Sequence, residues 1–593
     1  MIVCPVTLVK NWAREMNKWL GRSRLNMFVA DGKSNIKHFT SSPYYNIIII
    51  GYERLRTLSQ EINAVYPPIG LIIADEGHRL KSIEAKTTQA LRTLKTHRRV
   101  VLSGTPIQNN LNEYYAMVDF VNPGILSDFQ TFKKKFEQPI AKSREPGSTP
   151  SQKALGRSRA DELAELSDSY VLRRGSDVIA HHLPPRHDYC LFIDLAAAQK
   201  KIYAATLASP EIRAVFSGES SQQLVLINTL KKLCNSAGLL INETSIQNLA
   251  KNASTLFPAW VTRNDIKLSG KMIALASFLK ILHAKTDEKI ILVSNFTSTL
   301  DVIEAHCRSQ NYSLCRLDGK TPQTKRDDIV QTFNRMTARS QFVFLLSSKS
   351  GGVGLNLIGA SRLILFDSDW NPATDLQAMA RIWRQGQKKA CHIYRFLATG
   401  TIDECIFQRQ VTKTGLATDL IKDAGVSREV LDRGNTFTSD ELKRLFELHT
   451  GTPCHTHDLL GCRCFETKAS DEVAEDAVGQ ESDTDSLPEA SQLFQLATQY
   501  KPSNVQKEPK KLAELETWDH INTSLSDSLE ELNDSILYDT IVDLKSQLLE
   551  SDDEEDSHEH VATTKGGEIT FVFHKTNTIL GSTENSDVEV QGV

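Results

Sequence analysis

Short apolar runs alternate with amphipathic stretches in this chain, and this alternation limits the fold more than any other feature. In the first part of the chain the apolar runs are MIVCPVTLV (1–9), YNIIIIGYE (45–53), IGLIIADE (69–76) and RRVVLSGTP (98–106). Strands that are apolar on both faces and alternate with helices form parallel sheets covered by helices on each side. The sequence therefore predicts an α/β fold.

The same pattern begins again near residue 271, after a stretch of more helical character. The second set of runs is KIILVSNF (289–296), SLCRLDG (313–319), FVFLLSS (342–348), RLILFDSD (362–369) and CHIYRFL (391–397). Two sets of this kind predict two parallel-sheet lobes with helical insertions between them. Polar, turn-rich residues 143–168 are typical of a flexible insertion or crossover.

Charge separates the body of the chain from its C-terminal part. Residues 466–593 hold 30 acidic residues against 8 lysines and no arginine, whereas residues 1–465 hold 61 basic and 43 acidic residues. A basic body indicates a polyanion partner, and an acidic tail of low complexity indicates a disordered, solvated appendage. Within this tail, 512–549 has apolar residues at helical spacing, typical of a marginal amphipathic helix or a partner-binding one. The strand-like piece EITFVFHKT (568–576) could dock back on the body.

Five regions follow from these patterns. We predict a partial first lobe, helical insertions with an inter-lobe linker, a second lobe, a short segment after the second lobe with a candidate zinc site, and a mostly disordered acidic tail. Their bounds are 1–125, 126–265, 266–430, 431–465 and 466–593. No apolar run approaches the ~18 residues of a membrane span, so no membrane partner is expected. The ten scattered cysteines fit a reducing compartment.

Two adjacent acids follow the third apolar run, in the sequence Asp75-Glu76-Gly77-His78. An acid at the carboxyl end of a parallel strand can hold Mg²⁺ beside a nucleotide, and its neighbour can activate the attacking water. Asp75 would be the metal-side acid, Glu76 the general base, and His78 a relay to a second site. Alone, two acids after a strand also make an ordinary helix N-terminus.

Further polar and glycine-rich turns follow other predicted strands. The loop 103–110 (SGTPIQNN) contains Gln108, and the turn 348–356 (SKSGGVGLN) contains Gly352 and Gly354, whose bare backbone could approach phosphates. We assign Gln108, Gly352 and Gly354 to nucleotide binding.

A third set of candidate residues lies in QAMARIWRQGQ (377–387), which contains Gln377, Arg381 and Arg384. We assign these three residues to nucleotide binding as well. The two arginines, three residues apart on one helix face, could reach the γ-phosphate from the opposite lobe. The simpler reading is a basic surface face.

The order of these motifs resembles the Swi/Snf-type ATPases of helicase superfamily two. The motifs are IVCPVTLVKNW (2–12), IIGYE (49–53), DEGH, LSGTPIQNN, LVSNF, SSKSGGVGLNL, FDSDWNPATD (366–375) and QAMARIWRQGQ, and the resemblance covers about residues 1–465. The residues DEGH, RIWRQGQKK and IYRFLATGTIDECIFQRQ resemble the recombination-repair branch, and 441–464 resembles one paralogue in particular. The resemblance implies two RecA-like lobes that use ATP and Mg²⁺ to translocate on double-stranded DNA in homologous recombination. It also implies a RecA-type recombinase filament and chromatin as partners, and a nuclear location.

The family pattern requires a Gly-Lys-Thr phosphate loop before the first of these motifs. Three pairs in this chain mimic it, at Gly32-Lys33, Gly270-Lys271 and Gly319-Lys320, but none has the full loop spacing. We expect this chain to be a truncated form of a longer enzyme, to which the nucleotide-site roles belong. Its first lobe would lack a central strand, which would leave a hydrophobic slot and unpaired backbone groups. The alternatives are a DNA- or chromatin-binding adaptor without turnover, and a nucleosome remodeller.

Cysteines and histidines gather in the segment 454–464. Cys454, His457, Cys462 and Cys464 have the spacing C-x₂-H-x₄-C-x-C, and His455 is an alternative ligand. Three thiolates and one imidazole suit a tetrahedral structural Zn²⁺. The alternative is a set of reduced cysteines in a polar loop.

Overall fold

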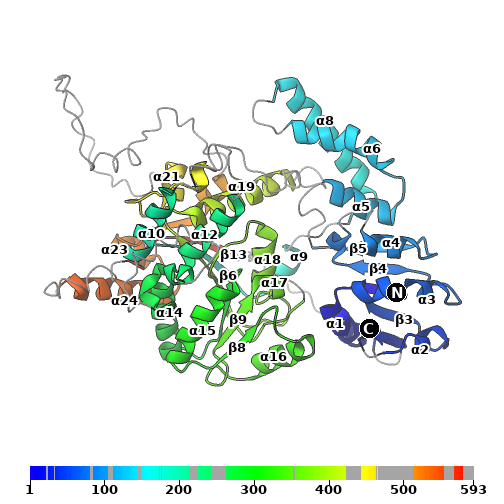
Figure 1. Ribbon diagram of the computed structural model, residues 1–593, viewed down its shortest axis with the longest axis horizontal. Coiled ribbons are helices and arrows are strands. Elements are labelled where there is room, and N and C mark those ends of the chain that lie inside the picture. Colours follow the sequence, from blue (N-terminus) through cyan, green and yellow to red (C-terminus); the bar gives the residue numbers. More distant parts are fainter. Residues whose placement is uncertain are drawn as a thin grey trace, which may run out of the picture.

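The computed structural model shows two sheets, one parallel and one mostly parallel, each with helices packed on both faces (Figure 1). It describes residues 1–21, 24–32, 34–80, 85–104, 111–143, 148–172, 174, 177–209, 212, 223–241, 262–351, 354–421, 443–462, 464, 512–552 and 566–577. We call the two sheets with their covering helices lobe one and lobe two. Within the described ranges, no helix is both long and apolar enough to cross a membrane.

Lobe one contains a five-stranded parallel sheet in the order β2-β3-β1-β4-β5. Its strands are β1 (Ile2–Cys4), β2 (Met27–Ala30), β3 (Ile47–Gly51), β4 (Ile72–Asp75) and β5 (Arg99–Leu102). The helices are α1 (Val9–Leu20), α2 (Lys37–Thr40), α3 (Tyr52–Asn63), α4 (Lys86–Arg92) and α5 (Leu111–Val121). Alternate residues of β1 and β3 enter two different clusters, because successive strand side chains point to opposite faces. The predicted burial on both faces is confirmed for β1 and β3 but not for β5, where exposed and half-buried residues alternate.

The five strands of lobe one are contiguous, so the expected slot inside the sheet is not found among the described residues. The uncovered apolar surface lies instead along the edge strand β5. Val100 and Leu102 on that strand are 40% and 39% exposed. An exposed apolar edge of this kind offers unpaired backbone groups to another strand.

A helical insertion follows lobe one. It comprises α6 (Phe129–Phe132), a π-helical turn (Lys133–Glu137), α7 (Gln138–Lys142), α8 (Pro150–Asp168) and α9 (Asp177–Ala180). The prediction of a flexible segment over 143–168 is wrong for most of this range. Thr149 caps α8 by accepting from the Gln152 backbone, and the Gln152 side chain accepts from the Thr149 backbone in return. This reciprocal cap stabilises α8, which the polar composition of 143–168 did not indicate.

Lobe two contains an eight-stranded sheet in the order β12-β13-β6-β11-β10-β7-β9-β8. Its parallel strands are β6 (Arg186–Ile193), β7 (Ile290–Ser294), β8 (Leu314–Leu317), β9 (Val343–Ser347), β10 (Arg362–Leu365) and β11 (Cys391–Ala398). Its helices are α10 (Ala197–Leu207), α12 (Gln223–Asn235), α14 (Gly270–Lys285), α15 (Thr297–Ser309), α16 (Gln323–Arg335), α17 (Ser348–Gly351), α18 (Pro372–Met379) and α19 (Ile402–Ile421). The five strands predicted for this lobe are confirmed.

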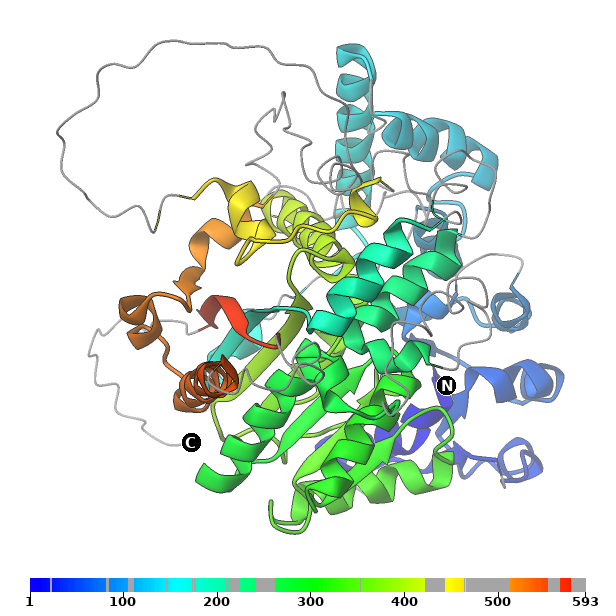
Figure 2. The same cartoon turned by 60° about the vertical axis from the view of Figure 1, so that its left-hand side comes forward.

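Two predicted boundaries differ from the structure. We assigned 126–265 to helices and linker, yet β6 lies in that range and pairs with β11 along its full length. Its residues Tyr189 to Ile193 are all at most 1% exposed, so β6 belongs to the core of lobe two. The other difference concerns the tail beyond residue 465, because 512–552 and 566–577 pack on lobe two (Figure 2). The remaining tail residues lie outside the described ranges.

Candidate functional site

The acids of the DEGH motif lie at the carboxyl end of β4, as the sequence predicts. Both oxygens of the Asp75 carboxylate accept hydrogen bonds, one from the Trp12 indole N–H at 2.8 Å and the other from the Glu76 backbone N–H at 2.9 Å. The Tyr52 hydroxyl donates to the Asp75 backbone carbonyl at 2.6 Å. The carboxylate is therefore held in one orientation, while each of its oxygens keeps a further lone pair for a cation.

Glu76 adopts a left-handed backbone conformation, with φ 53°. Such a conformation costs a non-glycine residue about 1–2 kcal/mol and is found at functional sites. Gly77, the next residue, has no room for a side chain, since a Cβ atom would lie 2.1 Å from Val101 Cγ1 on β5. Close packing of β5 against this turn thus fixes the backbone that follows Glu76.

Electrostatics around Glu76 favour proton uptake. Burial raises the pKa of Glu76, the neighbouring Asp75 carboxylate raises it further, and Arg381 and Arg79 oppose both effects. His78 Nδ1 lies 3.3 Å from the Glu76 carboxylate. A carboxylate with a raised pKa beside an imidazole is suited to general-base chemistry.

Arg381 belongs to lobe two, yet it acts electrostatically on Glu76 in lobe one. Burial lowers the pKa of Arg381 to about 10, the adjacent Arg384 lowers it as well, and Glu76 raises it. Arg384 is held by donating to the Leu355 carbonyl at 3.1 Å, and Glu15 of α1 is the acid that acts on it. The structure therefore brings Asp75, Glu76 and the two arginines to the junction of the lobes.

The prediction that Arg381 and Arg384 share a helix face is wrong, because α18 ends at Met379. The Arg381 carbonyl accepts from the Leu357 backbone N–H at 3.1 Å, and the Trp383 indole donates to the Pro184 carbonyl at 2.8 Å. These contacts draw the chain out of the helix into a turn. Gln377 lies half-buried on α18 itself.

The glycine-rich turn of lobe two touches lobe one. Gly354 has φ +68°, and a Cβ atom there would lie 1.8 Å from Cδ2 of Leu8. Gly354 therefore allows the two lobes to approach, which is a different role from the predicted approach to phosphates. Gln108 and Gly352 lie outside the described residues.

Two of the three residue pairs that mimic a phosphate loop have structural roles. Lys271 is buried and pairs with Asp403, and Lys320 lies in the turn after β8, where its backbone N–H donates to Asp318 at 2.9 Å. Neither position provides a loop at the junction of the lobes. Lys33 lies outside the described residues.

A cavity of about 390 Å³ opens at the carboxyl ends of β7, β8 and β9 in lobe two. Its lining includes Lys232, Asn295, Ser298, Ser347, Lys349 and Ser350. Two lysines together with hydroxyl groups at the N-terminus of α15 suit the oxygens of a phosphate. The sequence analysis assigned none of these residues to phosphate binding, although Lys349 and Ser350 lie in the glycine-rich turn 348–356 that it singled out.

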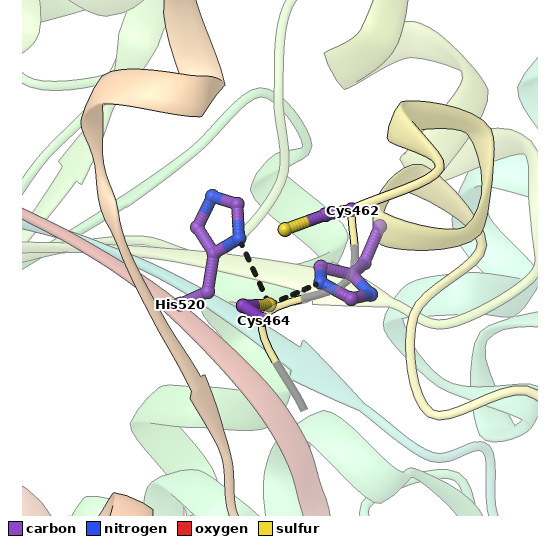
Figure 3. A group of neighbouring side chains, drawn as sticks. Cys462, Cys464 and His520 are labelled. Carbon is purple, nitrogen blue, oxygen red and sulfur yellow. Dashed lines mark hydrogen bonds between the residues drawn. The ribbon is translucent and has the colours of Figure 1, made fainter. Parts of the chain in front are cut away.

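A cluster of sulfur and imidazole groups lies where the body meets the C-terminal residues (Figure 3). His457 on α21 (His455–Leu460), Cys462, Cys464 and His520 on β12 (Asp519–Asn522) each offer one ligand atom, and these atoms lie within 4.8 Å of one another. Cys464 Sγ is 3.1 Å from His457 Nε2 and 3.6 Å from His520 Nδ1. Two thiolates and two imidazoles form a donor set that suits tetrahedral Zn²⁺.

The predicted ligand Cys454 is not in this cluster. Cys454 is 1% exposed, caps α21 by accepting from the His457 backbone, and donates to the Glu404 carboxylate at 3.7 Å. The alternative ligand His455 stacks on His449 with ring centroids 3.7 Å apart. His520 takes the fourth position, and its Nε2 donates to the Leu515 carbonyl at 2.9 Å, which leaves Nδ1 free to bind a metal.

Sequence reasoning also missed Trp12, Tyr52 and Glu15, which surround the candidate catalytic groups. The signal for Trp12 was present in the motif IVCPVTLVKNW, of which it is the last residue. Tyr52 likewise lies in the motif IIGYE (49–53). Glu15 gives no comparable signal, because its interaction with Arg384 depends on how α1 lies against lobe two.

Two family models match this chain in succession. The family model for the SNF2-related domain matches residues 1–239, and the model for the helicase conserved C-terminal domain matches residues 270–386. A solved structure, the Sulfolobus solfataricus SWI2/SNF2 ATPase core in complex with dsDNA, is 24% identical and covers 76% of this chain and 86% of that chain, with a TM-score of 0.34.

Two curated relatives are similar along most of the chain. DNA repair and recombination protein RAD54B of Mus musculus is 41% identical over 88% of this chain and 58% of that protein. DNA repair and recombination protein RDH54 of Saccharomyces cerevisiae (strain RM11-1a) is 37% identical over 92% of this chain and 60% of that protein. The chain thus spans less than two thirds of either relative, and RAD54B is the paralogue that residues 441–464 indicate. The chain belongs to the Swi/Snf family of helicase-like ATPases, within its recombination-repair branch.

Proposed function

We propose that this chain carries the motor core of an ATP-dependent translocase on double-stranded DNA that acts in homologous recombination and DNA repair. The observation that carries the proposal is the electrostatic interaction of Glu76 in lobe one with Arg381 in lobe two, at the junction where Gly354 lies against Leu8. A general base and an arginine on opposite lobes can act together only when the lobes close, which couples hydrolysis to lobe movement.

The residues at the junction have distinct roles in this proposal. Asp75 would hold Mg²⁺, which when bound offsets the negative charge of phosphate oxygens. Glu76 accepts a proton from the attacking water as the water oxygen bonds to the terminal phosphorus and the bond from that phosphorus to the β,γ-bridging oxygen breaks, which releases ADP. Arg381 and Arg384 donate to the oxygens on which negative charge develops, and His78 orients Glu76. Gln108, Gly352 and Gln377 stay assigned to nucleotide binding.

DNA is the polyanion that best fits the basic body of the chain. The cavity beside Lys232 and Lys349 would contact phosphates of one strand, and such contacts position a protein without reading the sequence. The names of the relatives support recombination and repair as the process. A nuclear location is proposed along with that process. A RecA-type recombinase filament and chromatin are the proposed protein partners.

Phosphate release from ATP, measured with and without duplex DNA, tests this function in a form of the chain extended to the length of its relatives and in the chain as given. In the extended form we expect turnover that duplex DNA stimulates, and a loss of about 10²- to 10⁴-fold in Glu76→Gln, because the amide cannot take the proton. DNA affinity should not change. Glu61→Gln, an exposed change on α3 with the same chemistry, is the matched control.

Other outcomes of this experiment favour other functions. Salt-dependent DNA binding without any turnover would replace the translocase by a non-enzymatic adaptor. Faster turnover on nucleosomes than on naked DNA, together with nucleosome sliding, would indicate a remodeller.

We further propose that His457, Cys462, Cys464 and His520 bind one structural Zn²⁺. Native mass spectrometry of the full chain should show one zinc ion, and Cys462→Ser or His520→Ala should remove it, because three ligands of the set bind far more weakly. Cys454→Ser should retain zinc, which separates this set from the one predicted by spacing. Retention of zinc in His520→Ala, with loss in Cys454→Ser, would contradict the structural set.

A further inference from the structure

The residues 512–552 and 566–577, which we call the C-terminal segment, complete the sheet of lobe two (Figure 2). Strand β13 (Ile569–Asn577) pairs antiparallel with β6 from Ile193 to Arg186, and β12 pairs with β13. In the described sheet, β6 would be an edge strand without this pairing. Strand addition of this kind is a common way in which a sheet binds an extended peptide.

Apolar side chains of the C-terminal segment enter the main core of lobe two. The helix α24 (Ser535–Asp552) lies along α14, and both contribute to one cluster with the strands. The buried members from the segment are Ile521, Leu529, Leu532, Ile536, Leu537, Ile541, Leu544, Ile569 and Val572. Burial of this many large side chains makes the segment part of the core rather than an appendage.

One buried ion pair fixes the N-terminus of α24. Asp534 is 2% exposed and accepts from Arg362 Nη1 at 2.9 and 3.1 Å, and from the Tyr394 hydroxyl. It also caps α24 by accepting from the Ile536 backbone N–H at 3.1 Å. Arg362 is buried at the start of β10 and has Glu288 as its other acid. Without Asp534, a buried guanidinium would lose one of its two counter-charges.

The charges of the two surfaces are complementary. Lys285 on α14 pairs with Asp539 on α24 at 2.7 Å, Lys280 pairs with Asp543 at 3.3 Å, and the Ser277 hydroxyl donates to Asp543 at 2.6 Å. Basic side chains of the body therefore face acidic side chains of the tail. At the opposite end of the segment, His520 is a ligand of the proposed zinc site, so the metal would join β12 to Cys462 and Cys464.

We propose that lobe two binds the C-terminal segment of its own chain as a partner, through the β6 edge, the α14 face and Arg362, and that this association survives cleavage of the connection. The proposal rests on the proposed function only where it uses the zinc site, since the other contacts are independent of metal and of ATP.

The test uses the full chain with a site-specific protease sequence inserted between residues 466 and 511. After cleavage, we expect the C-terminal piece and the body to elute together from gel filtration as one 1:1 complex. Asp534→Ala should weaken this association by about 10²- to 10³-fold. Asp527→Asn, which removes an exposed acid of the same segment, should leave it unchanged. Elution of the two pieces as separate species in the unmodified sequence would overturn the proposal.

Two further comparisons separate docking within one chain from a loss of folding and from loss of the zinc site. Lys285→Glu should weaken the association several-fold, and Lys285→Glu with Asp539→Lys should restore it, at positions exposed enough to fold normally. Complexes with two bodies and two segments would show docking between copies, which overturns binding within one chain. If His520→Ala or a chelator changes nothing while the pieces stay together, the zinc site fails and the docking proposal stands.

Discussion

Replacing Arg381 with alanine is expected to lower DNA-stimulated ATP turnover by about 10³- to 10⁵-fold, the loss typical of an arginine that stabilises phosphoryl transfer. Arg381 is buried at the junction, and its charge lowers the pKa of Glu76 across the lobes. The alanine variant therefore loses the positive charge next to the general base as well as the donor to the phosphate oxygens. Phosphate release at saturating duplex DNA measures the effect.

Arg381→Lys separates charge from geometry. It keeps the positive charge but not the planar fork of donors, so we expect turnover between those of the alanine variant and the wild type. Arg409→Ala, on α19 of the same lobe, is the control for a general loss of positive charge. Thermal unfolding of each variant checks that lobe two is folded. Turnover of the alanine variant within tenfold of the wild type would remove Arg381 from the catalytic role.

The pattern of strands was predictable because its cause is local. Each strand buried on both faces is a continuous apolar run, and nine such runs were identified correctly, from Ile2–Cys4 to Cys391–Ala398. The strand β6 was missed because its first half, Arg186-His187-Asp188, is polar, and because it lies far along the chain from its partner β11. Pairing across such a distance leaves no local signal.

The candidate catalytic groups were predictable for the same reason, since Asp75 and Glu76 follow their strand directly. The metal cluster was predictable only in part. Cys462 and Cys464 lie near His457 in sequence, but His520 lies 56 residues beyond Cys464, and only the pairing of β12 with β13 brings it there. Cys454 satisfied the spacing rule, yet its side chain points into the core and caps α21.

Asp403→Asn is expected to destabilise lobe two by about 3–5 kcal/mol, the cost of breaking a buried ion pair from one side. Lys271 and Asp403 are both 1% exposed, and the Lys271 ammonium also donates to the Phe366 carbonyl at 3.0 Å. The pair joins α14, the end of β10 and the start of α19. With asparagine at 403, the ammonium keeps only neutral acceptors in a site without access to water.

The double variant Lys271→Met with Asp403→Asn distinguishes a buried charge from a loss of packing. It removes both charges while nearly preserving volume, so we expect it to recover much of the stability that Asp403→Asn loses. Denaturant unfolding measures the free energy of unfolding of each variant, and hydrogen exchange in α14 reports on lobe two. The control is the exposed Lys267→Met, whose free energy of unfolding should stay within about 0.5 kcal/mol of wild type. Equal losses in the single and double variants would show that volume rather than charge governs this site. Phe366 is the first residue of the FDSDW turn, which leads into α18 and Arg381. When the Lys271–Asp403 ion pair is broken, we therefore expect faster hydrogen exchange in that turn as well. Such a result would link the stability of lobe two to the position of Arg381.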